Sequence, residues 1–204
     1  MLKLPKIYPI TNKEITRLSH PEQVEILIEA GATLIQLRDK NASSEDFYNE
    51  AADAIKLAHA SDVKIIINDR VDIALVLRAD GVHLGQDDLS PEHARRLLGN
   101  EAIIGLSTHN VEQAKLAAKL PVDYVAIGPI FSTKTKEDHE IPVGIEVVKA
   151  VKSAVGDLPV VAIGGIDQAN AAEVLSAGAM SLAVISALLS PPAEIVEKFK
   201  NFGI

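Results

Sequence analysis

Short runs of apolar, largely β-branched residues alternate with longer stretches rich in Ala, Leu, Glu and Lys along this chain. Most of the apolar runs are almost continuous, as is typical of strands that are covered on both faces. The stretches between them carry apolar residues at helical spacing, as Val24, Leu27 and Ile28 do within residues 21–30. The pattern predicts eight strands, at residues 6–11, 34–38, 64–68, 81–84, 103–107, 124–128, 160–164 and 182–186.

Helix-start and helix-end signals flank several of the intervening stretches. Ser43 and Asp46 have the spacing of a capping box for a helix that runs through Leu57. Ser90 followed by Pro91 is typical of an N-cap and the first helical residue. Three glycines fit helix C-termini, Gly31, Gly99 and Gly178.

The order of these elements predicts the fold class. Eight β units and eight α units alternate strictly, which indicates an α/β protein with a parallel sheet. Eight units favour a closed (β/α)8 TIM barrel, for which 204 residues are near the short end of the usual length. A doubly wound open sheet is the competing topology. Because no linker, low-complexity tract or charge block divides the chain, we predict a single domain over residues 1–204.

Polar residues accumulate where the predicted strands end, which is the rim that carries the active site in such barrels. They follow the second to the sixth strand and the eighth, and the seventh strand ends in a pair of glycines. The polar residues at this rim are Gln36, Arg38, Asp39, Lys40, Asn68, Asp69, Arg70, Gln86, Asp87, Asp88, Ser107, Thr108, His109, Thr133, Lys134, Thr135, Lys136 and Ser186.

The glycine pair Gly164 and Gly165 precedes a helix that we expect to begin near Asp167. Glycines at that place let backbone N–H groups approach a phosphate. The alternative interpretation is a tight turn that only requires glycine. Taken alone, the pair does not decide between the two.

Two carboxylates, Asp69 and Asp88, follow adjacent predicted strands. They have the right chemistry for Mg²⁺, which takes one or two carboxylates together with waters and substrate phosphates. The alternative is that both are N-caps of the helices that follow them. Asp87 is a rival ligand, and the sequence leaves that choice open.

Arg38, Lys40 and Lys136 bring positive charge to the same rim. Together with Mg²⁺ they would suit a diphosphate, although solvated surface charge is the simpler interpretation. The polar loop at 132–136 is consistent with a lid or with an ordinary connection. His83 and His109 are expected to be structural, since no metal-binding spacing of histidines is present.

Composition excludes several classes of function. The net charge of −8 and the aromatic content of 3% argue against a nucleic-acid partner. The chain has no Cys, so thiolate chemistry is absent, and no apolar run is long enough for a membrane span. The first ten residues lack the apolar region of a signal peptide. We expect a cytoplasmic protein that acts on small molecules, with a homodimer as a compatible assembly.

Seven segments, taken together, resemble the thiamine-phosphate synthase family. They occur in family order and span nearly the whole chain, and only the full set is specific, because AIGGI also occurs in other phosphate-binding barrels. The segments are QLRDK at 36–40, INDR at 67–70, GVHLGQDD at 81–88, GLSTH at 105–109, GPIFSTKTK at 128–136, AIGGI at 162–166 and AVIS at 183–186.

The resemblance implies a transferase that joins hydroxymethylpyrimidine diphosphate to a thiazole phosphate, or to its carboxylate form, and releases diphosphate. It implies one Mg²⁺ held at Asp69 and Asp88, with Arg38, Lys40 and Lys136 as the catalytic cations. The pyrimidine diphosphate would be bound at Gln36, Leu37, Arg38, Asp39, Lys40, Asn68, Ser107 and Lys136. The thiazole phosphate would be bound at Thr133, Lys134, Thr135, Gly165, Ile185 and Ser186.

Two departures from the family pattern concern turns near the site. The first strand ends in Asn12, where the family often has Asp, and Met180 with Ser181 stands where an Asp-Gly pair is usual. Two other functions stay open. They are a thiazole tautomerase-like isomerase on the same fold, to which His109 would offer proton transfer, and a non-catalytic thiamine-phosphate-binding protein.

Overall fold

Eight parallel strands form a single sheet in the computed structural model, which describes residues 3–133 and 141–203. The sheet runs in the order β1-β8-β7-β6-β5-β4-β3-β2. It closes where Ile10 bridges to Gln36 and the Thr11 N–H donates to the Gln36 carbonyl at 2.9 Å. The strands are β1 (Ile7–Pro9), β2 (Leu34–Leu37), β3 (Lys64–Asn68), β4 (Gly81–Leu84), β5 (Ile103–Thr108), β6 (Tyr124–Ile127), β7 (Val160–Ile163) and β8 (Ser181–Val184).

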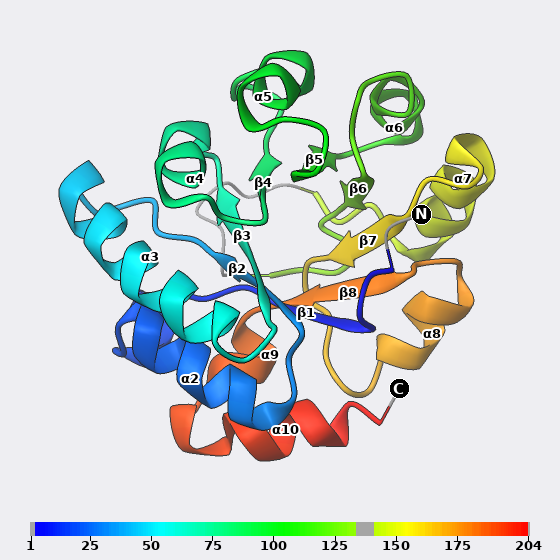
Figure 1. Cartoon of the computed structure of the whole chain (residues 1–204). Helices are drawn as coiled ribbons and strands as arrows, with labels where there is room; N and C mark the ends of the chain where they lie inside the picture. Colours follow the sequence, from blue (N-terminus) through cyan, green and yellow to red (C-terminus); the bar gives the residue numbers. More distant parts are fainter. Residues whose placement is uncertain (1–2, 134–140, 204) are drawn as a thin grey trace.

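Helices surround this barrel (Figure 1), so the predicted (β/α)8 architecture is confirmed and the open sheet is excluded. The helices are α1 (Lys13–Thr16), α2 (His20–Ala30), α3 (Ser44–His59), α4 (Val71–Leu77), α5 (Pro91–Leu98), α6 (Val111–Ala117), α7 (Ile145–Val155), α8 (Ala171–Ser176), α9 (Ser186–Leu189) and α10 (Ile195–Asn201), with a short 3-10 turn at Pro192–Glu194. No helix within the described ranges is long and apolar enough to cross a membrane.

The helix-start signals are partly confirmed. Ser90 caps α5, and Ser43 caps α3 by accepting a hydrogen bond from the Asp46 N–H. The capping box predicted at α3 is incomplete, because the Asp46 carboxylate accepts from the Ser43 hydroxyl. At α2 both bonds of a capping box are present: the Ser19 side chain accepts the Glu22 N–H, and the Glu22 side chain accepts the Ser19 N–H. The capping box is therefore complete at α2.

The helix expected near Asp167 begins later. Its first residue is Ala171, because the Asp167 carboxylate accepts the N–H groups of Ala169 and Asn170 and thereby closes a turn. Gly31 and Gly99 end α2 and α5 as expected, and Gly178 follows the last capping residue of α8.

The side chains of each strand alternate between two apolar layers. The even-numbered residues of β2, Leu34 and Gln36, point into the barrel, whereas Ile35 and Leu37 pack against the surrounding helices. The inner apolar layer consists of Tyr8, Ile10, Leu34, Ile66, Ile103, Tyr124, Ala126, Val161 and Ala183. Polar residues take the inward positions nearer the carboxyl ends of four strands, at Gln36, Asn68, His83 and Ser107.

One inward position must be glycine for steric reasons. A Cβ built on Gly105 would lie 2.1 Å from Cζ and 2.4 Å from the hydroxyl oxygen of Tyr124. Both distances are far below van der Waals contact, so the bare backbone of β5 is what leaves room for the Tyr124 ring.

We expect Gly105→Ala to lower the free energy of unfolding by about 2–3 kcal/mol, because the ring has little room to move in a packed interior. Gly31→Ala is the matched control, since its new Cβ meets open space and only the left-handed backbone, with φ 98° and ψ 19°, is unfavourable. The control should cost about 1–2 kcal/mol. Urea unfolding curves measure both, and equal losses would contradict the packing argument.

Candidate active site

A continuous chain of hydrogen bonds crosses the interior of the barrel. The Gln36 Nε2 donates to the Tyr8 hydroxyl at 3.0 Å, and that hydroxyl lies 3.2 Å from the hydroxyl of Tyr124. The Tyr124 hydroxyl lies 3.0 Å from His83 Nδ1, and His83 Nε2 lies 2.8 Å from Ser107 Oγ. Five strands therefore contribute to one network, which we call the interior relay.

One arrangement of hydrogens satisfies every bond of the interior relay. In it the Gln36 amide donates to Tyr8, Tyr8 to Tyr124, and Tyr124 to His83 Nδ1. His83 Nε2 then donates to Ser107. Burial raises the pKa of Tyr8 and of Tyr124, so both hydroxyls keep their hydrogens at neutral pH. The Ser107 hydroxyl retains its own hydrogen for donation.

Asp69 and Asp88 are brought together at the ends of β3 and β4. Burial, followed by the hydrogen bond to Asp88 and its negative charge, raises the pKa of Asp69 to about 6. Lys40 and Arg38 act in the opposite direction, and Lys40 Nζ lies 3.7 Å from Asp69 Oδ2. The two carboxyl groups thus share one small, partly buried space beside two cations.

Neither of these aspartates is an N-cap. The residue at the N-cap of α4 is Arg70, without a side-chain hydrogen bond, and Ser90 caps α5. Asp69 has a φ of 61°, and Asp88 Oδ2 accepts the Gly85 N–H at 2.6 Å. The helix-capping interpretation is therefore wrong, and these carboxylates are held at the rim for another reason.

Residues 37–40, at the end of β2 and just after it, differ in their surroundings. The Leu37 side chain is fully buried in the outer apolar layer, so it can reach a ligand in the barrel mouth only through its main chain. Arg38 is partly exposed and Lys40 is exposed, as a polyanion site requires. Asp39 accepts the N–H groups of Asn41 and Ala42, each at 3.0 Å, and so closes a turn of its own segment.

A cavity of about 510 Å³ lies at the ends of β6, β7 and β8. Four of the six residues expected to bind the thiazole phosphate line it, namely Thr133, Gly165, Ile185 and Ser186. The other two, Lys134 and Thr135, fall outside the described residues, as do Lys136 and most of the expected lid. The cavity gathers residues that are far apart in the sequence.

Gly164 and Gly165 shape this cavity through their backbone. Their φ values are 102° and 63°, and a Cβ on either would lie 2.5 to 2.7 Å from Pro129 or Phe131. The Phe131 N–H donates to the Gly164 carbonyl at 3.0 Å, so the segment after β6 lies directly on the glycine pair. Only glycine permits this close approach of the two segments.

Three members of the interior relay were not expected from the sequence to contribute to the site. Tyr8 and Tyr124 lie inside apolar strands, and His83 was expected to be structural. The signal available was strand parity, because Tyr124 has the same inward orientation as Ala126, two positions further on. The sequence alone does not show which hydroxyl meets which ring nitrogen across the barrel.

Comparisons with known proteins agree on one family. The model of the family described as thiamine monophosphate synthase matches residues 7–188. A thiamine-phosphate synthase of Chloroflexus aurantiacus is 44% identical over 186 residues, covering 91% of this chain and 85% of that protein. One from Koribacter versatilis is 42% identical over 205 residues, covering 97% and 95%.

A solved structure is similar over the same extent. Thiamine phosphate pyrophosphorylase from Pyrococcus furiosus superimposes with a TM-score of 0.86 at 35% identity, covering 97% of this chain and 93% of that one. A phosphoribosyl anthranilate isomerase from Thermus thermophilus, at 14% identity and a TM-score of 0.68, shares the fold alone.

From the hydrogen bonds of the interior relay we predict how much stability the protein loses when one hydroxyl is removed. Tyr124→Phe leaves the Tyr8 hydroxyl and His83 Nδ1 without that partner in a buried interior, so the free energy of unfolding should fall by about 1–3 kcal/mol. Tyr48→Phe, at a site 39% exposed, is the control and should change it by less than about 0.5 kcal/mol. Urea denaturation measures both, and equal stability of the two variants would show that the relay contributes nothing.

Proposed function

The chain belongs to the thiamine monophosphate synthase family, and on that premise we propose that it forms thiamine phosphate from hydroxymethylpyrimidine diphosphate and a thiazole phosphate or its carboxylate form. The observation that supports this best is the pairing of two different anion sites at one rim. Carboxylates and cations meet after β2 to β4, and a glycine-lined cavity opens after β6 to β8. A reaction between two phosphorylated substrates requires such a pair.

The pyrimidine diphosphate is assigned to the first of these sites. Gln36, Asn68 and Ser107 point inward around the barrel mouth, and their amide and hydroxyl groups suit the edge of a pyrimidine. Arg38 and Lys40, together with Lys136 from the family resemblance, neutralise the diphosphate. This places the pyrimidine against the interior relay and the diphosphate at the rim.

The donor set at Asp69 and Asp88 fits Mg²⁺. Burial raises the pKa of Asp69, and the hydrogen bond to Asp88 and its negative charge add to that rise. A divalent cation between the two carboxyl groups would relieve their mutual repulsion. Within the described residues no group of three or more His, Cys, Asp or Glu side chains is arranged to hold a metal ion. Held by Asp69 and Asp88, Mg²⁺ would take its other ligands from waters and substrate phosphates. When bound, Mg²⁺ would neutralise charge on the departing diphosphate.

The chemistry proposed is a dissociative substitution. The C–O bond of the pyrimidine diphosphate breaks and diphosphate leaves with the electron pair, which produces a pyrimidinylmethyl cation stabilised by the amino group of the ring. The lone pair of the thiazole nitrogen then forms the C–N bond. With the carboxylate form, the carboxyl group also leaves as CO₂ and a proton takes its place on the ring. Arg38, Lys40 and Lys136 stabilise the leaving diphosphate, and no protein nucleophile is needed.

The second cavity orients the thiazole for that attack. Its phosphate is assigned to the backbone of Gly165 and to Thr133 and Ser186, with Lys134 and Thr135 added from the family resemblance. Holding the phosphate there would fix the distance between nitrogen and cation. The reaction also requires that water be excluded from this cavity, since water would otherwise capture the cation.

A thiazole tautomerase-like isomerase is the second candidate. His109 is the observation that favours it, since its Nδ1 lies 3.0 Å from the Gly128 carbonyl close to the thiazole side. An isomerase would need neither the carboxylate pair nor the cations beside it. A binding protein without turnover is the third alternative.

We further propose that the chain acts in the cytoplasm and as a homodimer, both of which remain predictions.

The decisive measurement is diphosphate release from purified protein given both substrates, with and without Mg²⁺. We expect metal-dependent release that matches the amount of thiamine phosphate formed. Isomerisation of the thiazole carboxylate phosphate without diphosphate release would establish the tautomerase. Tight binding of thiamine phosphate without turnover would establish the binding protein.

The metal assignment is tested without turnover by thermal unfolding. Mg²⁺ should raise the melting temperature of the wild type, because an ion that binds only the folded state stabilises it. The increase should be lost in Asp69→Asn and Asp88→Asn and kept in Asp87→Asn, the neighbouring rival ligand. If Mg²⁺ fails to raise the melting temperature only in Asp87→Asn, then Asp87 and not Asp69 or Asp88 is the metal ligand.

A further inference from the structure

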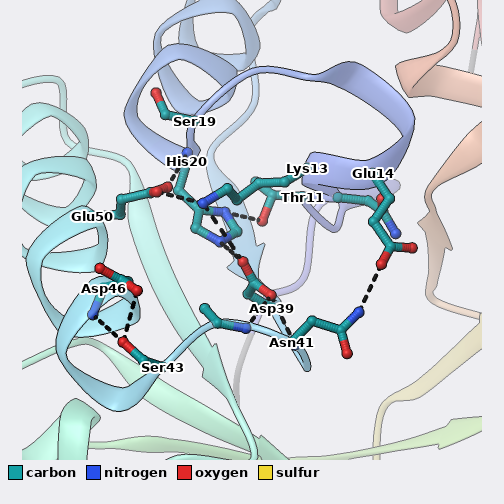
Figure 2. A network of polar contacts seen from close by, with 12 residues as sticks. Thr11, Lys13, Glu14, Ser19, His20, Asp39, Asn41, Ser43, Asp46 and Glu50 are labelled. Atoms are coloured by element: carbon teal, nitrogen blue, oxygen red, sulfur yellow. Dashed lines mark hydrogen bonds and ion pairs between the residues drawn. The ribbon is translucent and has the colours of Figure 1, made fainter.

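The cationic segment at 38–42 rests on a buried polar network behind the barrel mouth. Figure 2 shows this network, to which the end of β1, α1, α2 and α3 all contribute. None of the groups described below was needed for the chemistry proposed above. They nevertheless contact the backbone that carries Arg38 and Lys40, and these contacts suggest a function in catalysis.

Thr11 is the first support of this segment. Its side chain is fully buried, and its Oγ1 accepts the Arg38 N–H at 3.2 Å. The same oxygen lies 2.9 Å from His20 Nδ1 and 3.3 Å from the Gln36 carbonyl. One hydroxyl therefore contacts the backbone on both sides of Leu37, at the point where β2 ends and the cationic segment begins.

His20 is the second support, and its burial is energetically costly. The ring has no exposed surface and packs against Phe47 with ring centroids 5.5 Å apart. Its Nε2 makes no hydrogen bond within the described part of the chain and lies 3.7 Å from Asp39 Oδ2. An aliphatic or aromatic residue would pack there without an unpaired nitrogen. The presence of an imidazole at this buried position is explained if the ring connects Thr11 to Asp39.

The charge of Asp39 selects the form of the imidazole that makes this link. A carboxylate beside Nε2 favours the tautomer with the hydrogen on that nitrogen, which leaves Nδ1 as an acceptor. The Thr11 hydroxyl then has two acceptors for its hydrogen, His20 Nδ1 at 2.9 Å and the Gln36 carbonyl at 3.3 Å. Burial lowers the pKa of His20, which keeps the ring neutral. The Thr11 oxygen then offers its lone pairs to the Arg38 N–H.

Asp39 is the third support, and its carboxylate is occupied by the protein itself. Oδ1 accepts the N–H groups of Asn41 and Ala42, and Oδ2 faces Lys13 Nζ at 3.8 Å as well as His20. Lys13 in turn pairs with Glu50 of α3. The carboxylate therefore ties the far end of the segment to α1, α2 and α3 and lies between side chains of the protein in Figure 2.

We propose that Thr11, His20 and Asp39 are positioning residues, which hold the main chain of residues 38–42 so that Arg38 and Lys40 meet the diphosphate of the pyrimidine substrate. This inference rests on the proposed function. Asp39 then serves the site through its segment and not by touching substrate. A displaced cation loses much of its effect, since small errors in position weaken both binding and catalysis.

Thr11→Val tests the first support, because valine keeps the shape and removes the oxygen. We expect the KM for the pyrimidine diphosphate to rise about tenfold while the KM for the thiazole phosphate stays within about twofold. Thr11→Ser restores the oxygen and should restore the KM. Thr16→Val is the matched control, since Thr16 is also buried but, among the described residues, its hydroxyl makes hydrogen bonds only to the backbone of Asn12 and Leu18.

The same experiment can overturn the proposal. If Thr11→Val lowers the melting temperature and leaves the KM for the pyrimidine diphosphate unchanged, Thr11 is only structural. If Thr16→Val raises that KM equally, the effect is general destabilisation. A proportional rise of both KM values would also contradict a role confined to the cationic segment.

Asp39 gives an independent test by calorimetry with inorganic diphosphate and Mg²⁺, which needs no turnover. Asp39→Asn keeps an oxygen for the N–H groups of Asn41 and Ala42 and should weaken binding less than Asp39→Ala, which we expect to weaken it about tenfold. Equal binding by the wild type and Asp39→Ala would refute the proposal. A wild type that binds diphosphate normally but makes no thiamine phosphate would instead refute the proposed function.

Discussion

The Thr11 N–H donates to the Gln36 carbonyl at 2.9 Å, and this hydrogen bond lies at the seam where the barrel closes. Both residues also act through their side chains. Gln36 begins the interior relay that ends at Ser107, and Thr11 holds the main chain at Arg38. The closure of the fold and the placement of the proposed pyrimidine side of the site therefore depend on the same two neighbours. A change in the seam would move a hydrogen-bonding surface and a cationic segment together.

Charged and uncharged polar groups occupy different parts of the barrel. Inside the barrel, burial raises the pKa of Tyr8 and Tyr124 and so keeps both hydroxyls uncharged, and every group of the interior relay has a hydrogen-bond partner. Charged groups are confined to the rim, where Asp69, Arg38 and Lys40 retain contact with solvent. Unpaired charge would be costly in the interior. A neutral floor beneath a charged rim suits a substrate with a neutral ring and an anionic tail.

Much of the fold could be predicted from the sequence, because buried parallel strands require continuous β-branched runs and helices require caps. The eight strands were predicted in this way with ends that differ from the observed ones by at most two residues, and so was the cap at Ser90. The start of the helix after Asp167 was wrong, since an aspartate that closes a turn resembles one that caps a helix. The choice between ligand and cap at Asp69 could not be made, because it depends on Asp88, which only the closed barrel brings near. The interior relay was missed for the same reason, since Tyr8 and Tyr124 are 116 residues apart.

An acidic chain with a net charge of −8 can hold two anionic substrates only if its cations are concentrated and fixed. Long-range attraction is absent, so binding must come from short contacts at a few prepared positions. A flexible Lys or Arg at such a position loses side-chain entropy when it binds, and movement of its backbone would increase that loss. Anchoring the main chain of residues 38–42 from behind, through Thr11, His20 and Asp39, removes part of this cost before substrate arrives. The buried, incompletely paired imidazole is consistent with that function, since the free energy lost there is offset by order in the segment that meets the diphosphate.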